Sequence, residues 1–321
     1  MSAMPASLAL PRDMRPILIS ASFIVVILIA GTAYTLSRFG SAPLLQPTYL
    51  LQQLQIGSFL GIVAAGMMVV ILISQIDLSV PWTLTAAAMM ATAVGGAWAL
   101  PIGLGVGLAV GIVNGVAVAY LRIPSMIFTL GINAVMRGLM VAHTGGFAPQ
   151  ATATDLMRFL AAERLVGIPN ALFVWIAVSV VVAVMLKRTA LGRYIYAIGN
   201  KEAAAYLAGV NTRGVIVACF GLCGLLAGLA GVLLAGYSTK AYQGMGDAYL
   251  LPAIAAVVIG GTNILGGRGR YLGTLVGVIL IVLLNSVLSI MEMPEAGRQV
   301  IYGAVIIMML LVYGRSERVT S

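Results

Sequence analysis

Residues 189–215, TALGRYIYAIGNKEAAAYLAGVNTRGV, form a polar and basic interruption in a chain that is otherwise mostly apolar. Residues 201–208 are mostly strong helix formers, Asn200 is a candidate N-cap, and Gly209 suits the C′ position after a helix end. The stretch therefore predicts a helix of about two turns. A helix this short is not stable alone, so it must dock on other structure.

The surface through which this short helix docks is an apolar stripe. Ala203, Tyr206, Leu207 and Val210 fall at i, i+3, i+4 and i+7, whereas Ala205 lies on the opposite face. The stripe packs either on helix ends of the same chain or on a second protein. We interpret the helix as a docking element and the apolar chain as the part that it moves.

The composition is that of a membrane protein. Of 321 residues, 61% are hydrophobic and 8% are charged, and several apolar runs are long enough to cross a bilayer. The net charge of +9 comes from basic residues at the ends of apolar runs, so it reflects membrane orientation and does not indicate a nucleic-acid partner. The predicted fold class is an all-α polytopic membrane protein embedded in a lipid bilayer.

The chain divides into a cytoplasmic N-terminal segment 1–16, a transmembrane domain 17–314 with a coupling loop at 187–214, and a cytoplasmic tail 315–321. No cleavage signal follows the first apolar run, so it is expected to be a retained span. About ten transmembrane helices are predicted, some of them broken: 17–36, 54–74, 81–98, 100–120, 127–142, 171–186, 215–237, 249–265, 272–291 and 300–313.

The basic residues predict an orientation with both termini in the cytoplasm. In that topology twelve Lys and Arg residues lie on the cytoplasmic side and five lie outside, while Arg137 falls within a span. The outer connection 145–169 is a second long polar segment, which is either a docking surface or a solvated linker.

The residues that catalysis would need are scarce. His143 lies near a predicted membrane boundary, where a structural role is more common than a catalytic one, and Cys219 and Cys223 are expected to be buried packing residues. The chain has no G-x-x-x-x-G-K-[ST] phosphate-binding loop, and the glycine-rich run 260–269 is typical of a turn. No catalytic, cofactor or metal site is predicted, and any ATP must bind to another polypeptide.

Asp77 is the most informative acidic residue. It lies with Ser79 in the short junction between two apolar runs, where a carboxylate must cap a helix, pair with a cation or line a hydrated cavity. We expect a capping role, with Pro81 in the first turn of the next helix, and keep direct solute contact as the alternative.

The predicted fifth span carries a polar stripe. Thr129, Asn133 and Arg137 are spaced four residues apart and share one helix face. The stripe either lines a water-accessible pathway or makes interhelical hydrogen bonds. The other polar positions within predicted spans that need partners are Asn114, Asn263 and Asn285.

Several short motifs occur in a specific order between about residues 60 and 290. They are IDLSV at 76–80, NG at 114–115, TLG at 129–131 with RG at 137–138, LGR at 191–193 with YAIGN at 196–200, EAA at 202–204, and AAVVIGGT at 255–262 with GGRG at 266–269. Together they resemble the permease subunits of ATP-binding-cassette importers for sugars, the ribose-permease-like family. The chain departs from the family in having Ser74, Gln75 and Pro81 around IDLSV, and one glycine before Asn200.

The resemblance implies a bacterial inner-membrane subunit that pairs with a second permease subunit. It also implies two cytoplasmic ATPase subunits, which contact the coupling helix, and a periplasmic solute-binding protein. The residues placed at the ATPase contact are Arg193, Glu202, Ala203, Tyr206, Leu207 and Gly209.

The predicted function is transport of a small polar solute, with a monosaccharide as the first choice. An autonomous ion-coupled carrier or channel is the alternative, against which stands the scarcity of acids within the spans. A membrane-embedded enzyme is disfavoured because no His, Cys and acidic residues converge.

Overall fold

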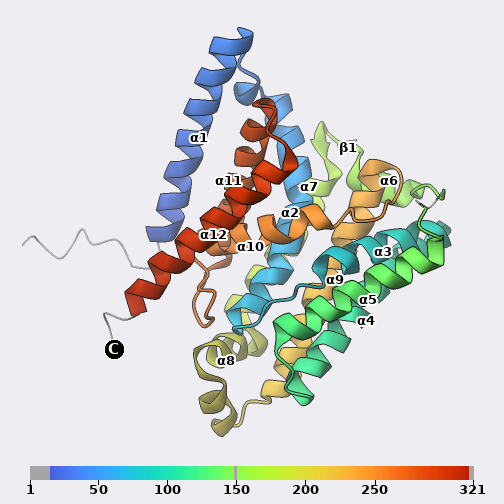
Figure 1. Cartoon of the computed structure of the whole chain (residues 1–321), viewed down its shortest axis with the longest axis vertical. Coiled ribbons are helices and arrows are strands. Elements are labelled where there is room, and N and C mark those ends of the chain that lie inside the picture. The colour runs from blue at the N-terminus through green and yellow to red at the C-terminus, as the bar shows by residue number, and fades with distance from the viewer. Residues whose placement is uncertain (1–14, 148–149, 318–321) are drawn as a thin grey trace, which may run out of the picture.

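The computed structural model describes residues 15–147 and 150–317. Nearly all of its regular structure is helical (Figure 1), which confirms the predicted all-α fold class. Most of the two predicted terminal segments, 1–16 and 315–321, lies outside the described residues. The helices are α1 (Arg15–Phe39), α2 (Pro47–Leu72), α3 (Val80–Val94), α4 (Ala99–Tyr120), α5 (Ser125–Thr144), α6 (Asp155–Ala161), α7 (Asn170–Arg188), α8 (Ala190–Leu207), α9 (Thr212–Ser238), α10 (Leu250–Ile259), α11 (Tyr271–Ile290) and α12 (Glu295–Glu317).

Short elements connect these helices. Single 3-10 turns occur at η3 (Pro43–Leu45), η4 (Gly96–Trp98) and η5 (Asp247–Tyr249). The strands β1 (Arg164–Leu165) and β2 (Ile168–Pro169) pair antiparallel, with Arg164 opposite Pro169. Helix α6 and this small hairpin make up most of the predicted outer connection.

Seven helices in the described part of the chain are long and apolar enough to cross a membrane: α1, α2, α4, α5, α7, α9 and α11. The predicted spans 81–98 and 249–265 are instead helices α3 and α10, of 15 and 10 residues. At about 1.5 Å per residue, neither helix covers the ~30 Å hydrocarbon core. Glycines with positive φ end them, at Gly95 (66°) and Gly261 (89°). The count of ten spans stays a prediction.

Helix α2 lies at the centre of the fold. All residues from Gly57 to Leu72 are buried, and the helix packs against α7, α9, α10 and α11. A helix that is apolar and buried on every side has no face left for solvent or lipid. The other elements are therefore arranged around it.

Helices α4 and α9 cross at glycines. The carbonyl oxygen of Gly224 would lie 2.2 Å from a Cβ placed on Gly107, and the Phe220 oxygen would lie 2.3 Å from one on Gly111. Gly103 and Gly115 continue this stripe along α4. Because lipid gives no hydrophobic drive for helix association, close backbone packing of this kind is what holds the pair together.

This crossing generates a stability prediction for Gly107→Ala. The added methyl group has no space against the α9 backbone, so the free energy of unfolding should fall by about 1–3 kcal/mol. Thermal unfolding of the detergent-solubilised protein measures the loss. Gly105→Ala on the same helix is the matched control, since a Cβ there meets nothing within 4 Å and Ala favours helix. Equal unfolding temperatures for the two variants would contradict the packing argument.

Candidate functional site

The predicted docking helix is the second half of α8. The helix is interrupted at Lys201, whose φ of −164° and ψ of 102° are not helical. The predicted N-cap at Asn200 is therefore wrong. Asn200 still belongs to the first half of α8, where its side-chain amide donates to the Tyr196 carbonyl at 3.0 Å. The first half carries Arg193, whose side chain is exposed.

The end of α8 has the predicted geometry. Gly209 has a φ of 84°, and its N–H donates to the Tyr206 carbonyl at 2.9 Å. The N–H of Val210 donates to the Ala205 carbonyl at 3.1 Å. This pair of bonds is a Schellman motif, which needs a left-handed residue at C′, and glycine adopts that conformation without steric cost.

The apolar stripe of α8 faces away from the described chain. Leu207 is 85% exposed and Tyr206 is 68% exposed, and Ala203 is exposed beside them. Val210 is half-buried, and Ala205 is only 5% exposed, so the face opposite the stripe packs on the body of the protein. The exposed apolar surface of α8 is thus available to another molecule.

The second half of α8 is also tied to the end of α4. The Glu202 carboxylate pairs with the guanidinium of Arg122, 2.7 Å apart, and Arg122 lies two residues after the end of α4 at Tyr120. Both side chains are partly exposed, so this ion pair orients the helix more than it stabilises the fold.

The first half of α8 contacts two other backbones at once. A Cβ on Gly199 would lie 1.8 Å from the Leu72 carbonyl oxygen and 2.5 Å from the Gly267 nitrogen. The Gly267 N–H donates to that same Leu72 oxygen at 2.9 Å, and the Tyr196 hydroxyl donates to the Gly269 carbonyl at 2.9 Å. Helix α8 is therefore joined to the end of α2 and to the glycine-rich turn 260–269. Sequence reasoning missed this junction, although all its glycines lie within the motifs quoted above.

A buried polar group forms the break between α2 and α3. One oxygen of the Asp77 carboxylate accepts from the Ser79 N–H at 2.9 Å, from the Ser79 hydroxyl at 2.6 Å and from the Asn114 amide at 3.3 Å. The Asn114 amide also donates to the Ser79 hydroxyl at 2.8 Å. Asp77 is 1% exposed and Asn114 is fully buried. The N-cap of α3 is Ser79, so Asp77 does not occupy the cap position itself; its carboxylate closes a turn onto Ser79 at the positive end of α3, where a negative group is favoured.

The polar stripe of α5 faces the same helix start. Thr129 Oγ1 accepts from the Leu78 N–H at 2.9 Å, and Asn133 Oδ1 accepts from the Trp82 N–H at 3.3 Å. The guanidinium of Arg137 lies 5.8 Å from the centre of the Trp82 ring. The first N–H groups of a helix have no partner within it, and here side chains of a neighbouring helix supply partners. The tertiary structure thus brings six of the eight predicted polar positions together.

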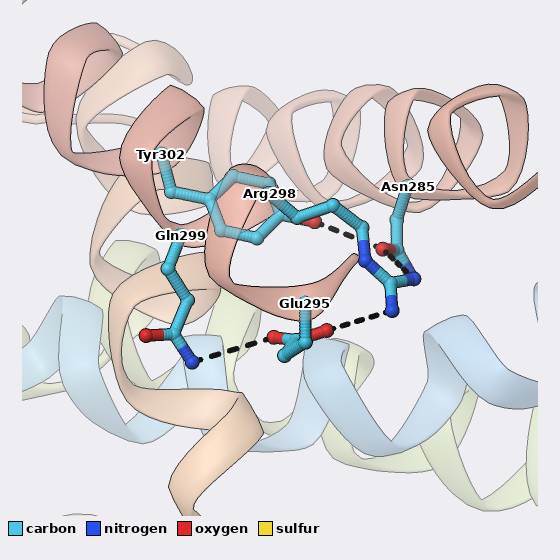
Figure 2. Close-up of polar contacts among 5 residues, drawn as sticks. All are labelled: Asn285, Glu295, Arg298, Gln299 and Tyr302. Carbon is cyan, nitrogen blue, oxygen red and sulfur yellow. Dashed lines mark hydrogen bonds and ion pairs between the residues drawn. The ribbon is translucent and has the colours of Figure 1, made fainter. Parts of the chain in front are cut away.

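The other two predicted positions lie elsewhere. Asn263 shapes the turn after α10, where its Oδ1 accepts from the Leu265 N–H at 3.1 Å. Asn285 lies on α11, where its Oδ1 accepts from Arg298 at 3.0 Å and from the Tyr302 hydroxyl at 3.1 Å. Figure 2 shows Arg298 lying between Asn285 and Glu295, and its guanidinium pairs with the Glu295 carboxylate at 2.9 Å.

Comparison with known proteins identifies the family. Residues 49–310 match the family model described as the permease component of branched-chain amino acid transport systems. The chain belongs to this family. The permease is accordingly the membrane component of a transport system, and the polar helix break and α8 lie within the matched region.

The relatives of the permease are import permeases. It is 36% identical over 272 residues to the ribose import permease protein of Escherichia coli, covering 82% of this chain and 85% of the relative. It is 34% identical over 274 residues to the ribose import permease protein of Bacillus subtilis, covering 84% and 85%. The autoinducer 2 import system permease protein of Escherichia coli is 32% identical over 259 residues, covering 79% and 75%. No solved structure matches the chain.

The Asp77 geometry predicts opposite results for two substitutions. Asp77→Asn keeps an acceptor oxygen at the start of α3, so the permease should fold and transport at near wild-type levels. Asp77→Leu leaves the buried Ser79 N–H without its acceptor, at a cost of about 1–3 kcal/mol, while the Asn114 amide keeps its bond to the Ser79 hydroxyl. The variant should therefore lower the yield of folded protein. Gel filtration of the detergent extract measures the yield and vesicle uptake measures transport. Normal abundance of Asp77→Asn without transport would show instead that the charge itself is needed.

Proposed function

We propose that the permease is one half of the membrane pathway of an ATP-binding-cassette importer for a monosaccharide. The observation that carries this proposal is the end of α8, where Tyr206 and Leu207 are exposed on a helix too short to be stable without a partner. The names of the relatives support a small solute of this kind, since two of them are ribose import permeases.

The complete importer contains two permease subunits, forming a homodimer or a heterodimer, together with ATPase subunits and a solute-binding protein. The permease pairs with a second permease subunit in the bacterial inner membrane, and two ATPase subunits dock on α8 from the cytoplasm. A periplasmic solute-binding protein delivers the sugar to the opposite side. The permease carries out no bond chemistry, and the ATPase subunits bind and hydrolyse the ATP.

The coupling of ATP hydrolysis to transport follows from the contacts of α8. When the ATPase subunits close, they displace the exposed stripe of α8. The displacement reaches the end of α2 through Gly199 and Leu72, and it reaches the turn 260–269 through Gly267 and Tyr196. Both contacts lie next to helix breaks, one before α3 and the other between α10 and α11. The structure then shifts between inward-open and outward-open states because ATP binding favours one of them.

The ion-coupled carrier is less well supported. A coupling acid must be free to bind and release an ion, whereas the Asp77 carboxylate accepts three hydrogen bonds at the start of α3. Uptake into vesicles with and without ATP separates the two functions. Uptake driven by an ion gradient in the absence of ATP would favour the carrier.

The proposed orientation predicts the accessibility of two introduced cysteines. Ala208 is exposed at the end of α8, and Val166 is 93% exposed in the connection at the opposite end of the molecule (Figure 1). A membrane-impermeant thiol reagent should label Ala208→Cys only from the cytoplasm and Val166→Cys only from outside. The native Cys219 and Cys223 are buried and add little background. The reverse pattern would overturn the orientation with both termini in the cytoplasm.

The docking role of α8 predicts the behaviour of Leu207→Asp. This change places a charge in an apolar contact, and burying an unpaired charge is strongly unfavourable. The variant should insert normally but lose both ATPase co-purification and ATP-dependent uptake, whereas Leu207→Met should be tolerated.

Val166→Asp is the matched control for this test. It makes the same kind of change at an exposed apolar residue at the opposite end of the molecule, and it should keep ATPase co-purification. Ala205 is unsuitable as a control because it is buried. If Leu207→Asp keeps ATP-dependent uptake, or fails to insert, the stripe does not serve a separable partner.

A further inference from the structure

A cavity of about 420 Å³ lies at the end of the molecule opposite α8. It lies between the first turns of α2, the last turns of α11, the start of α12 and the η5 segment. The volume falls within the range of small-molecule sites, ~300–1,000 Å³. Leu60 is the lining residue of α2 nearest its end, and the twelve residues from there to Leu72 at the α8 junction span about 18 Å at 1.5 Å per residue.

The lining of this cavity combines aliphatic side chains with tyrosine rings and neutral polar groups. Tyr49, Tyr249 and Tyr302 contribute rings from three different elements, and Gln53 and Ser289 contribute neutral polar groups beside them. Aromatic rings provide rigid apolar surface, while amide and hydroxyl groups both donate and accept hydrogen bonds. A polyhydroxylated ring presents the same alternation of C–H surface and hydroxyl groups.

The cavity is also close to electrically neutral. Glu295 is the one acidic residue among its lining residues in the described part of the chain, and Arg298 pairs with its carboxylate at 2.9 Å. An amino acid would need an anionic partner for its ammonium group and a cationic partner for its carboxylate, whereas Glu295 and Arg298 are already paired with each other. This lining suits an uncharged solute better than a zwitterion.

One polar group of the wall is fixed in place before any solute arrives. Asn285 Oδ1 accepts from Arg298 at 3.0 Å and from Tyr302 at 3.1 Å (Figure 2). These two donors set the orientation of the amide, so the polar group that Asn285 can still offer is its nitrogen, with two N–H donors. A pre-set donor loses little freedom when it binds a hydroxyl oxygen.

We propose that this cavity is the outer binding site of the permease for an uncharged polyhydroxylated solute of monosaccharide size. The proposal rests on the proposed function, which places this end of the molecule at the outer face, where the binding protein releases its sugar. It places the solute site apart from the polar group at the start of α3, where the Asp77, Ser79 and Thr129 side chains bond to the protein itself.

Protection of an introduced cysteine tests the site. Ser289→Cys places a thiol in the lining, and Ser37→Cys places one in an exposed position near the end of α1, away from the cavity. A membrane-impermeant thiol reagent is applied to the assembled importer with D-ribose, D-xylose, D-glucose, D-galactose or L-leucine. We expect at least one sugar to slow the labelling of Ser289→Cys several-fold, with no effect of leucine and no effect of any probe on Ser37→Cys. The proposal is overturned if no sugar protects, or if leucine protects and the sugars do not.

Two variants of α2 give an independent test. Gln53 lines the cavity, and its neighbour Gln52 is exposed and does not. Gln53→Leu should lower ATP-dependent sugar uptake by about tenfold, as expected for losing one or two hydrogen bonds. ATPase co-purification should stay normal, and Gln52→Leu should behave like the wild type.

The results also separate the two proposals. The wild-type assembly could take up sugar although no sugar protects Ser289→Cys and Gln53→Leu keeps full activity. That result would overturn the proposed binding site and leave the proposed importer function intact. If the wild-type assembly takes up no sugar in the presence of ATP, both the importer function and the binding site are contradicted.

Discussion

Backbone groups at a helix break inside a bilayer must find partners within the protein, and this constraint organises the centre of the permease. Helix α2 ends at the buried Leu72, and α3 starts after a short connection, 73–79, in which Asp77 and Ser79 are buried and Ser74 is exposed. Asp77 on the connection and Thr129 and Asn133 on α5 accept hydrogen bonds from the N–H groups at this restart. Each unmade bond at these buried groups would cost about 1–3 kcal/mol, because a buried donor has no water molecule to bond instead. The polar residues of the break therefore serve first to bond the backbone groups at the start of α3.

In the proposed importer, the break between α2 and α3 is also where a movement of α8 at the cytoplasmic surface would be passed on to the membrane helices. Helix α8 lies against the last carbonyl of α2 with no space for a side chain at Gly199. Flexible side chains can change rotamer to absorb a small movement, but two backbones in direct contact cannot. A displacement of α8 would therefore move the end of α2. In the proposed importer the glycines at this junction would pass motion from α8 to α2, whereas those between α4 and α9 hold two helices in close backbone contact.

The polar residues fall into two environments with different chemistry. Around α3 most polar side-chain atoms bond to backbone or to one another, although the buried Asn114 Oδ1 has no hydrogen-bond partner in the described part of the chain. At the opposite end, Asn285 is oriented by Arg298 and Tyr302 beside an open cavity, so part of its hydrogen-bonding capacity remains for a ligand. A transport protein needs both arrangements, because the helices around a pathway must keep their backbones satisfied while the pathway itself exchanges water for solute.

The sequence by itself determined the local features. Apolar runs predicted membrane helices, the left-handed preference of glycine predicted the end of α8 at Gly209, and four-residue spacing placed Thr129, Asn133 and Arg137 on one face. Each depends on residues close together in the chain. Only the tertiary structure decided where that face points, that Ala205 is buried, and that the α8 helix breaks at Lys201 after Asn200. It also decided that α3 and α10 stop short of a full span, and that Asn285 meets residues of another helix. These outcomes depend on contacts between segments far apart in the chain, which periodicity and spacing do not encode.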